Sequence, residues 1–355
     1  MLEFRDKKTT KALIKEIRKI SPQNNIKVMH VCGTHEMTIA RWGLRELLPK
    51  NIELISGPGC PVCVTSASEI DFAIKLAREK NVILTTFGDM FRVPGTNSSL
   101  SEAKSQGADA RIVYGIDEAT KIAAETEKQV VHFSIGFETT APSIAAEILE
   151  SKMLKNFSII CSHRLIPPAM DYLLASEDIE IDGFICPGHV STIIGYEPYG
   201  VLAEKFAKPM VVGGFEPNDI LLSILMILKQ IRAESPRAQN EYTRAAKKEG
   251  NILAKKMMND VFEICDKGWR GIGIIPNSGL RLKDEFAEFD GEKKFKVEIR
   301  KSRDLRPGCK CGEIMKGKAI PQDCPYFRKA CAPENPIGAC IVSSEGPCYI
   351  AYSYS

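Results

Sequence analysis

Cysteines are the residues of this chain whose number and spacing predict chemistry. The chain holds twelve cysteines in 355 residues, and six of them lie beyond residue 308. A buried cysteine that only packs behaves as a small hydrophobic residue and can fall anywhere in a core. Cysteines that gather at short spacings among glycines and prolines instead indicate thiolates that converge on a metal, a cluster or a redox partner.

The C-terminal tail offers enough thiolates to hold an inorganic cluster. Four cysteines are separated there by six, eight and seven residues: Cys324, Cys331, Cys340 and Cys348. Four thiolates suit a [4Fe–4S] cluster or a structural zinc ion. Zinc sites usually pair their cysteines in short knuckles, so these longer spacers favour iron–sulfur. A further pair, Cys309 and Cys311, could replace two of the four ligands or form a separate thiol pair.

The motif GPGCPVC carries the second group of thiols, Cys60 and Cys63. A CxxC pair at the end of a predicted strand and before a predicted helix is typical of a thiol–disulfide site. The free N–H groups and the dipole of the first helical turn lower the pKa of a thiolate at that position. The alternative is a metal half-site that shares its ligands with the tail.

The motif CGTHE adds a third candidate group, again directly after a predicted strand. Cys32 is expected at the carboxyl end of its strand, where open α/β sheets bind ligands. His35 could act as a metal ligand, a base or a hydrogen-bonding group that orients another. Glu36 is a candidate helix cap or acid/base. Cys32 and His35, together with Cys60 and Cys63, are therefore the candidate catalytic residues.

Two further turns are expected at the same edge of the sheets. Glu138 in GFETTAP and His189 in CPGHVS are candidate polar groups there, with helix capping as the alternative role for each turn. Glu216 and Asp219 in GGFEPND are interpreted as helix caps. The remaining cysteines are predicted to be buried thiols: Cys161, Cys186 and Cys265.

Short β-branched runs alternate with helix-compatible segments through the first two thirds of the chain. Eight strands are predicted, at 26–31, 52–56, 82–86, 111–113, 130–135, 157–161, 183–186 and 210–212. This alternation implies parallel sheets with right-handed crossovers. The strands could form one sheet or two, and an internal echo between HVCGTHE and HFSIGFETT favours two.

The expected fold is α/β, with two pseudo-repeated parallel-sheet domains and a third, cluster-binding part. The first domain covers 26–128 with the CGTHE and GPGCPVC motifs, and the second covers 129–215 with GFETTAP and CPGHVS. The third part combines residues 216–355 with an N-terminal helix in 1–25. Residues 234–268 within it are predicted to be helical. The tail has little hydrophobic periodicity, which indicates a segment held by a bound cluster.

Charge and hydropathy exclude several classes of function. The net charge of +3 is small against 48 basic and 45 acidic residues, so we expect no nucleic-acid or membrane partner. The first residues are charged from residue 3 onward and lack the apolar region of a signal peptide. We therefore expect a cytoplasmic protein, in which a structural disulfide framework is unfavourable.

Taken together, the motifs resemble those of the HypD family of [NiFe]-hydrogenase maturation proteins. The matching segments are CGTHE (32–36), IELISGPGCPVCV (52–64), GFETTAP (136–142), PGHVS (187–191), GFEPND (214–219) and PQDCPYFRKACAPENPIGACIVSSEGPC (321–348). They run through most of the chain, and their joint pattern is far more specific than any single CxxC.

The resemblance implies partners and an iron site. HypD proteins form a stable complex with the small chaperone HypC, and this complex is the scaffold on which Fe(CN)2CO is assembled. HypE, which is loaded by HypF, is the transient cyanide donor, and the hydrogenase large subunit is reached through HypC. Cys32 corresponds to the family's iron ligand, which is shared with the N-terminal cysteine of HypC. Cys60 and Cys63 complete the expected metal site.

The resemblance also implies a redox function. A [4Fe–4S] cluster is expected at the four tail cysteines named above, and with Cys60 and Cys63 it would act as a thiol redox relay. Fe(II) carrying cyanide and carbon monoxide is the expected cargo, so the protein is an assembly scaffold with redox chemistry rather than a conventional turnover enzyme. Two alternatives stay open: a stand-alone iron–sulfur thiol–disulfide reductase in which Cys32 is incidental, and a zinc-stabilised binding module.

Overall fold

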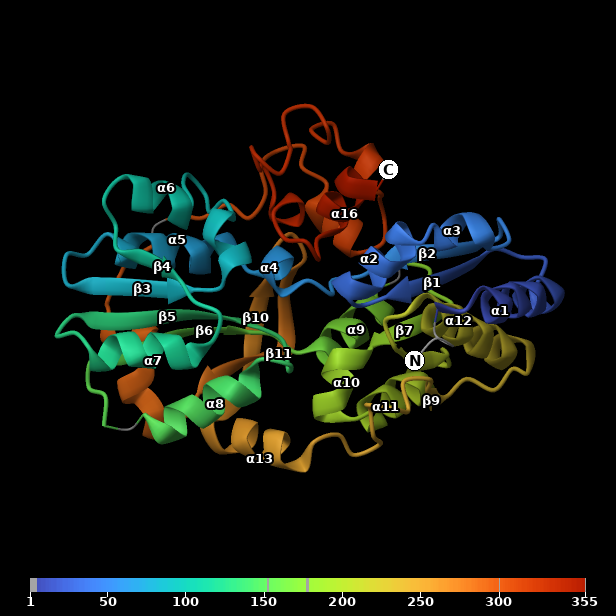
Figure 1. Ribbon diagram of the computed structural model, residues 1–355, viewed down its shortest axis with the longest axis horizontal. Coiled ribbons are helices and arrows are strands. Elements are labelled where there is room, and N and C mark those ends of the chain that lie inside the picture. The colour runs from blue at the N-terminus through green and yellow to red at the C-terminus, as the bar shows by residue number, and fades with distance from the viewer. Residues whose placement is uncertain (1–4, 152, 177–178, 300, 355) are drawn as a thin grey trace.

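The computed structural model describes residues 5–151, 153–176, 179–299 and 301–354. Two parallel sheets lie beside each other, and the cysteine-rich tail sits above the junction between them (Figure 1). A β-hairpin lies between the two sheets, below the tail in the same view. The α/β class with two parallel sheets is thereby confirmed.

The first sheet has five parallel strands in the order β2-β1-β7-β8-β9. Its strands are β1 (Ile26–His30), β2 (Ile52–Ser56), β7 (Gly183–Pro187), β8 (Met210–Gly213) and β9 (Ala238–Asn240). The second sheet has four parallel strands in the order β4-β3-β5-β6. Its strands are β3 (Val82–Thr86), β4 (Ala110–Ile112), β5 (Gln129–Gly136) and β6 (Phe157–His163). All eight strands predicted from the sequence are present.

Helices join and cover the strands. The α-helices are α1 (Lys7–Ile20), α2 (Gly33–Arg41), α3 (Leu44–Leu47), α4 (Pro61–Val64), α5 (Ala67–Ala77), α6 (Leu100–Ser105), α7 (Ile116–Ala124), α8 (Ala141–Glu150), α9 (Ile166–Leu174), α10 (Gly188–Ile194), α11 (Glu197–Phe206), α12 (Pro217–Arg232), α13 (Ile252–Val261), α14 (Gly291–Lys294), α15 (Cys311–Met315) and α16 (Pro347–Tyr354). Short 3-10 turns are η2 (Gly88–Arg92), η3 (Asp284–Phe289), η4 (Pro321–Asp323) and η5 (Ala339–Ile341). No helix of the described residues has the length and apolar character needed to cross a bilayer.

The two sheets do not coincide with the ranges 26–128 and 129–215 that we expected for two domains. Each range contributes two strands to each sheet, because β1 and β2 pair in the first sheet while β3 and β4 pair in the second. The chain leaves the first sheet after β2, builds the whole second sheet, and returns through α9 to β7. Strand prediction from local sequence does not reveal which strands share a sheet.

The helix predicted over 234–268 is correct only for α13. Residues 262–269 instead form β10 (Phe262–Trp269), which pairs antiparallel with β11 (Gly273–Leu282). Both ends of β10 are buried, whereas Ile264 and Asp266 between them are exposed. Pairing with β11 and the half-buried position of the hairpin therefore override the helical propensity of this charged segment.

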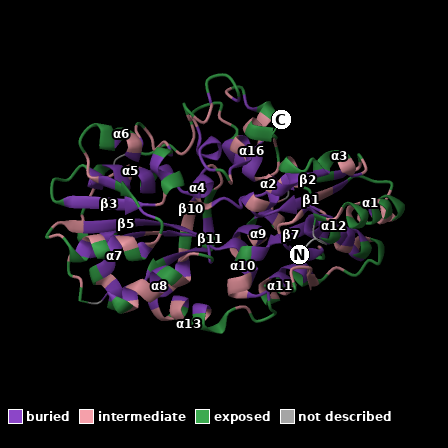
Figure 2. Cartoon of the chain, in the orientation of Figure 1, coloured by how far each residue is buried: buried purple, intermediate pink, exposed green. Residues whose placement is uncertain are grey.

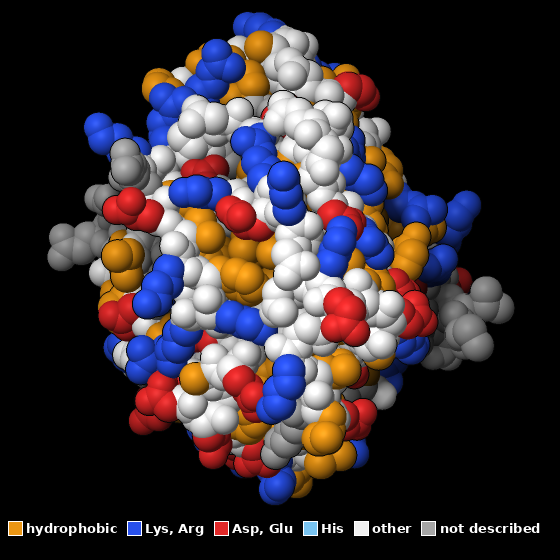
Figure 3. Space-filling view, turned by 90° about the vertical axis from the view of Figure 1, so that its left-hand side faces the viewer, with side chains coloured by type: hydrophobic (Ala, Val, Ile, Leu, Met, Phe, Trp, Pro, Cys, Tyr) orange, Lys and Arg blue, Asp and Glu red, His pale blue; other side chains and the backbone are white. Residues whose placement is uncertain are grey.

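Buried residues concentrate in the strands and at the junction, whereas the outer faces of the helices are exposed (Figure 2). One continuous core contains Ile55 of β2, Phe133 of β5 and Met315 of α15. The tail thus packs against both sheets instead of extending from them. At the end of the molecule that carries β3 and α7, charged side chains of both signs surround hydrophobic ones near the centre (Figure 3). This mixture agrees with the small net charge of the chain.

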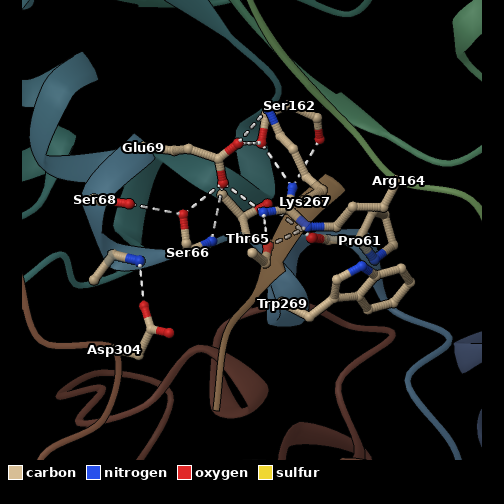
Figure 4. A network of polar contacts seen from close by, with 12 residues as sticks. Pro61, Thr65, Ser66, Ser68, Glu69, Ser162, Arg164, Lys267, Trp269 and Asp304 are labelled. Atoms are coloured by element: carbon tan, nitrogen blue, oxygen red, sulfur yellow. Dashed lines mark hydrogen bonds and ion pairs between the residues drawn. The ribbon is translucent and has the colours of Figure 1, made fainter. Parts of the chain in front are cut away.

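A buried ion cluster joins α5, the end of β6 and the hairpin (Figure 4). The carboxylate of Glu69 on α5 accepts hydrogen bonds from Ser162 of β6 and from the guanidinium of Arg164. The Nζ atom of Lys267 on β10 lies 3.2 Å from Oε1 of the same carboxylate. Arg164 also donates to the carbonyl of Gly268. By itself, burial raises the pKa of Glu69, but Arg164 and Lys267 outweigh it and lower that pKa.

We predict that Glu69→Gln lowers the free energy of unfolding by about 3 kcal/mol, because it leaves two buried cations without a counter-charge. The lowered folded pKa means that this stabilisation is complete above the unfolded pKa of about 4.3 and is lost as pH falls further. Urea denaturation at pH 7 and at lower pH measures both effects. Glu53 is exposed, so Glu53→Gln serves as the control and should change the free energy of unfolding by less than about 0.5 kcal/mol. A mutant equal to wild type at pH 7 would contradict the prediction.

Candidate functional site

Cys32 lies where β1 ends and α2 begins. Its backbone is extended and it occupies the N-cap position of α2. Its thiol is buried, and the nearby backbone N–H groups of Thr34 and His35 act to lower its pKa. Burial, with the nearby carboxylate of Glu345 adding to it, nevertheless raises the pKa of Cys32 to about 11. Cys32 is therefore a protonated thiol at neutral pH.

The GPGCPVC turn lies directly against Cys32. The backbone N–H of Gly33 donates a hydrogen bond to the carbonyl of Gly59 over 3.3 Å. A Cβ atom at Gly59 would lie 2.2 Å from the backbone nitrogen of Cys32, so only glycine fits. Cys60 and Cys63 are joined by a disulfide, and Cys60 caps α4 by accepting a hydrogen bond from the N–H of Cys63.

A small pocket brings the two motifs together and is closed by the tail. Cys32 and Cys60 both line it, and Glu345 belongs to the tail segment that covers it. The other lining residues are His30, Gly33, Glu36, Ser56, Gly57, Gly59, Met315 and Pro347. The close approach of the tail requires Gly33, because a Cβ there would lie 2.4 Å from the Cβ of Glu345. Three segments far apart in the sequence therefore form one site.

His30 is a pocket residue that sequence reasoning missed. Its Nε2 lies 2.8 Å from a carboxylate oxygen of Glu36, and Arg45 binds the same carboxylate with two nitrogens. Burial alone raises the pKa of Glu36, but the hydrogen bond from His30 and the charge of Arg45 lower it to about 2. The sequence did hold a signal, because His30 and Cys32 are two residues apart near the end of a strand and so point to the same side.

His35 does not line this pocket. Its Nε2–H donates a hydrogen bond of 3.2 Å to the carbonyl of Gly213, and its ring packs on Phe215. Its Nδ1 has no hydrogen-bond partner among the described residues. Burial, reinforced by the neighbouring His30, lowers the pKa of His35 to about 3, so the ring is neutral. This position suits a residue that holds the turn after β8 against α2.

The other candidate polar groups lie outside the pocket. Glu138 is buried, and one of its oxygens accepts a hydrogen bond from the N–H of Ile166. Burial raises the pKa of Glu138 to about 7. His189 stacks on Phe215 with ring centroids 3.9 Å apart. Both residues follow strands at the junction, as expected, but neither touches the pocket shared by Cys32 and Cys60.

The predicted helix caps are confirmed, and the predicted buried thiols only in part. Glu216 is the N-cap of α12, and Asp219 completes its capping box. Cys186 is fully buried at the end of β7. Cys161 and Cys265 are only partly buried. They lie where the open hairpin partly covers the second sheet, so the prediction of complete burial is wrong for these two.

All six tail thiols gather in one region. The thiol of Cys311 contacts those of Cys309, Cys340 and Cys348. Cys309 also contacts Cys324, and Cys331 lies near both of these thiols. Cys309 and Cys311 therefore lie in the same group of thiols as the predicted cluster ligands, which are Cys324, Cys331, Cys340 and Cys348.

Gly338 makes room for part of this thiol group. A Cβ atom there would lie 2.5 Å from the Sγ of Cys311 and 3.1 Å from that of Cys309. Within the described ranges, no three or more histidine, cysteine or carboxylate side chains are placed to hold a single metal ion. The tail nevertheless brings six thiols together, and thiolate is the donor type that iron–sulfur clusters use.

Comparisons with known proteins point to one family. A family model described as "HypD: Hydrogenase formation hypA family" matches residues 8–355. A protein of Methanocaldococcus jannaschii, whose name assigns it to hydrogenase expression or formation, is 48% identical over 358 residues, covering 100% of this chain and 99% of that protein.

Two relatives carry maturation-factor names. Hydrogenase maturation factor HypD2 of Bradyrhizobium diazoefficiens is 46% identical over 365 residues, covering 99% of this chain and 96% of its own length. Hydrogenase maturation factor HypD of Azotobacter vinelandii is 42% identical over 363 residues, with the same coverage of 99% and 96%. The similarity thus spans essentially the whole of each protein.

We predict that Glu345→Gln makes Cys32 more reactive, because the substitution removes a negative charge that raises the thiol pKa. Alkylation requires the thiolate, so the rate for Cys32 at pH 9 should rise about threefold, the effect of half a pKa unit. Pulsed alkylation followed by peptide mass spectrometry measures it, with Cys265 on the hairpin as the internal reference. An unchanged ratio of the two rates would show that Glu345 does not act on Cys32.

Proposed function

The chain belongs to the HypD family and acts in hydrogenase maturation, and from this premise we propose that it is the scaffold on which the Fe(CN)2CO group is assembled. One observation carries the proposal: Cys32 and Cys60 line the same pocket, and the tail with its six thiols closes it. In this proposal the thiol of Cys32 binds iron, the CxxC pair exchanges electrons and the tail thiols hold a cluster, and their proximity supports such a joint function.

In this proposal Cys32 binds the iron cargo. Low-spin Fe(II) that carries cyanide and carbon monoxide is a soft metal centre, and a thiolate is an apt ligand for it. The N-terminal cysteine of HypC supplies a second thiolate, as the family resemblance implies. His30 and Glu36 line the pocket beside Cys32, where they can orient and hydrogen-bond groups at the iron.

A larger groove offers a route by which a partner segment can reach the pocket. It runs between β2, which is an edge strand of the first sheet, and the segment from Ile314 to Asp323. Glu36 and Ser56 line both the groove and the small pocket. We propose that the N-terminal segment of HypC enters along this groove, since an edge strand can pair with an added strand.

The redox part of the proposal assigns Cys60 and Cys63 as the pair that exchanges electrons during assembly. Reducing their disulfide takes two electrons and two protons and yields two thiols. A [4Fe–4S] cluster in the tail would supply electrons one at a time. The proposed ligands remain Cys324, Cys331, Cys340 and Cys348, and Cys309 and Cys311 lie in the same thiol group.

The remaining partners follow from the same proposal. HypE is the transient cyanide donor, and the hydrogenase large subunit receives the assembled group through HypC. The protein then acts as a scaffold that changes redox state instead of a conventional turnover enzyme.

A stand-alone thiol–disulfide reductase is the second candidate, since Cys60 and Cys63 form a disulfide. Its substrate would be a disulfide of another protein, which must reach the attacking sulfur. Cys60 and Cys63 are 3% and 0% exposed, so the pair is accessible only through a rearrangement of the tail. This burial favours a partner within the site, and Cys32 lines the same pocket as Cys60.

We predict that Cys32→Ala abolishes binding of the iron cargo and leaves the tail unaffected. The complex with HypC is purified anaerobically, and infrared spectra are recorded in the cyanide and carbonyl stretching region. The bands should be present in wild type and in the control Cys265→Ala, and absent in Cys32→Ala. Bands of full intensity in Cys32→Ala would exclude Cys32 as an iron ligand and favour the reductase.

We predict that the anaerobically purified chain contains about four irons with matching sulfide and no zinc. Single cysteine-to-serine replacements in the tail identify the ligands by loss of iron and of visible absorption. Loss is expected at Cys324, Cys331, Cys340 and Cys348, whereas Cys309→Ser and Cys311→Ser should retain the cluster. Stoichiometric zinc without iron would overturn the cluster and support the binding module.

A further inference from the structure

A polar pocket outside the Cys32 site lies against another side of the tail. It is formed by the loop of residues 94–99 that leads into α6, by the segment 303–306, and by the tail loop 334–337. Asp71 holds the first two walls together, because it accepts hydrogen bonds from Thr96 and from Ser302. The pocket is therefore part of the folded structure and has fixed walls.

The pocket is lined by four basic and three acidic side chains, so basic groups are in slight excess. Four arginines line the pocket: Arg92, Arg270, Arg303 and Arg306. Within the described part of the chain, none of their guanidiniums forms an ion pair with a carboxylate. Three carboxylates also line the pocket, but two of them already bind backbone N–H groups: Glu102 binds Ser99, and Asp304 binds Ala67.

Arg270 is the most unusual of the four. It is only 2% exposed, and its Nε donates a hydrogen bond of 2.7 Å to the carbonyl of Asp304. Its Nη1 is buried and has no hydrogen-bond partner among the described residues. Leaving such a donor unsatisfied costs about 1–3 kcal/mol or more, and arginine cannot lose its charge in a protein. The site therefore lacks an acceptor.

The other lining groups are chiefly hydroxyls and amides. Ser101 supplies a hydroxyl and Asn97 an amide, whereas the hydroxyls of Thr96 and Ser98 already donate to Asp71 and to the carbonyl of Ser99. Arg306 is held in place over the ring of Tyr326, and Arg92 by a hydrogen bond to the carbonyl of Pro333. Guanidiniums fixed in this way, together with neutral donors, match the geometry and charge of an oxyanion.

We propose that this pocket binds a phosphate-type oxyanion, with the buried guanidinium of Arg270 at its floor and the other arginines around it. The oxyanion is either free phosphate or pyrophosphate, or the phosphate group of a small metabolite. Arg270 also lies near the thiols of Cys311 and Cys340, so the bound anion would sit next to the redox-active part of the tail. The proposal goes beyond the assembly of Fe(CN)2CO and does not depend on it.

Calorimetric titration of the full chain tests the proposal, with inorganic phosphate, pyrophosphate and glycerol phosphate as separate probes at constant ionic strength. We expect saturable binding of at least one probe. Arg303→Gln and Arg92→Gln should each weaken it about tenfold, because each removes a charge-assisted hydrogen bond. Arg232→Gln at the exposed end of α12 is the matched control and should bind as wild type does.

The probes also distinguish the two sources of the anion. Binding of phosphate or pyrophosphate supports a free anion, and binding of glycerol phosphate alone supports a phosphorylated metabolite. The absence of saturable binding of every probe to a chain that unfolds cooperatively would overturn the proposal. Equal affinity in wild type, Arg303→Gln and Arg92→Gln would also overturn it, since these exposed side chains can be changed without disturbing the core.

Discussion

The buried carboxylate of Glu69 holds together segments that are far apart in the sequence. It is the shared counter-charge of Arg164 and Lys267, which come from the second sheet and from the hairpin. It also holds Ser66, one of the two residues between the CxxC helix and α5. One charge therefore fixes α5 against the end of β6 and the hairpin, which also meet through the backbone pairing of Arg164 with Gly279. Because the chain passes from the first sheet to the second at this point, the same charge determines where α4 and its disulfide face the tail.

Close backbone approach is the second constraint, and it acts on the candidate site itself. Gly59 lets the CxxC turn touch the backbone of Cys32, and Gly33 lets the tail touch the start of α2. Side chains at these positions would separate the thiol, the disulfide and the tail by at least the width of a methyl group. Since packed interiors have little free volume, that separation would be transmitted to the whole junction. The three segments can therefore converge only because Gly33 and Gly59 have no side chains, and attractive contacts alone would not bring them together.

The features of this molecule that depend on local sequence pattern could be predicted from the sequence. The features that depend on packing between distant segments could not. The strands were readable because buried parallel strands such as β3 (VILTT) are rich in β-branched residues. The assignment of strands to sheets was not readable, since it depends on the crossovers after β2 and β6. His35 seemed the natural partner of Cys32 because it follows in the same motif, yet helix α2 turns it toward Gly213. His30, which lies two residues before Cys32 at the end of β1, lines the pocket instead.

The high pKa of Cys32 gives the pocket a selective character. Burial and the carboxylate of Glu345 keep the thiol protonated, so binding of a metal there must displace a proton. The bond that a weakly bound ion forms to sulfur is too weak to offset the free energy of removing this proton. A soft metal centre forms a stronger bond to sulfur and can offset it. The tail that carries Glu345 also covers the pocket, and it limits access to whatever a partner brings. Under the proposed function, the same residues make Cys32 a poor ligand for stray ions and a suitable one for a metal that a partner delivers.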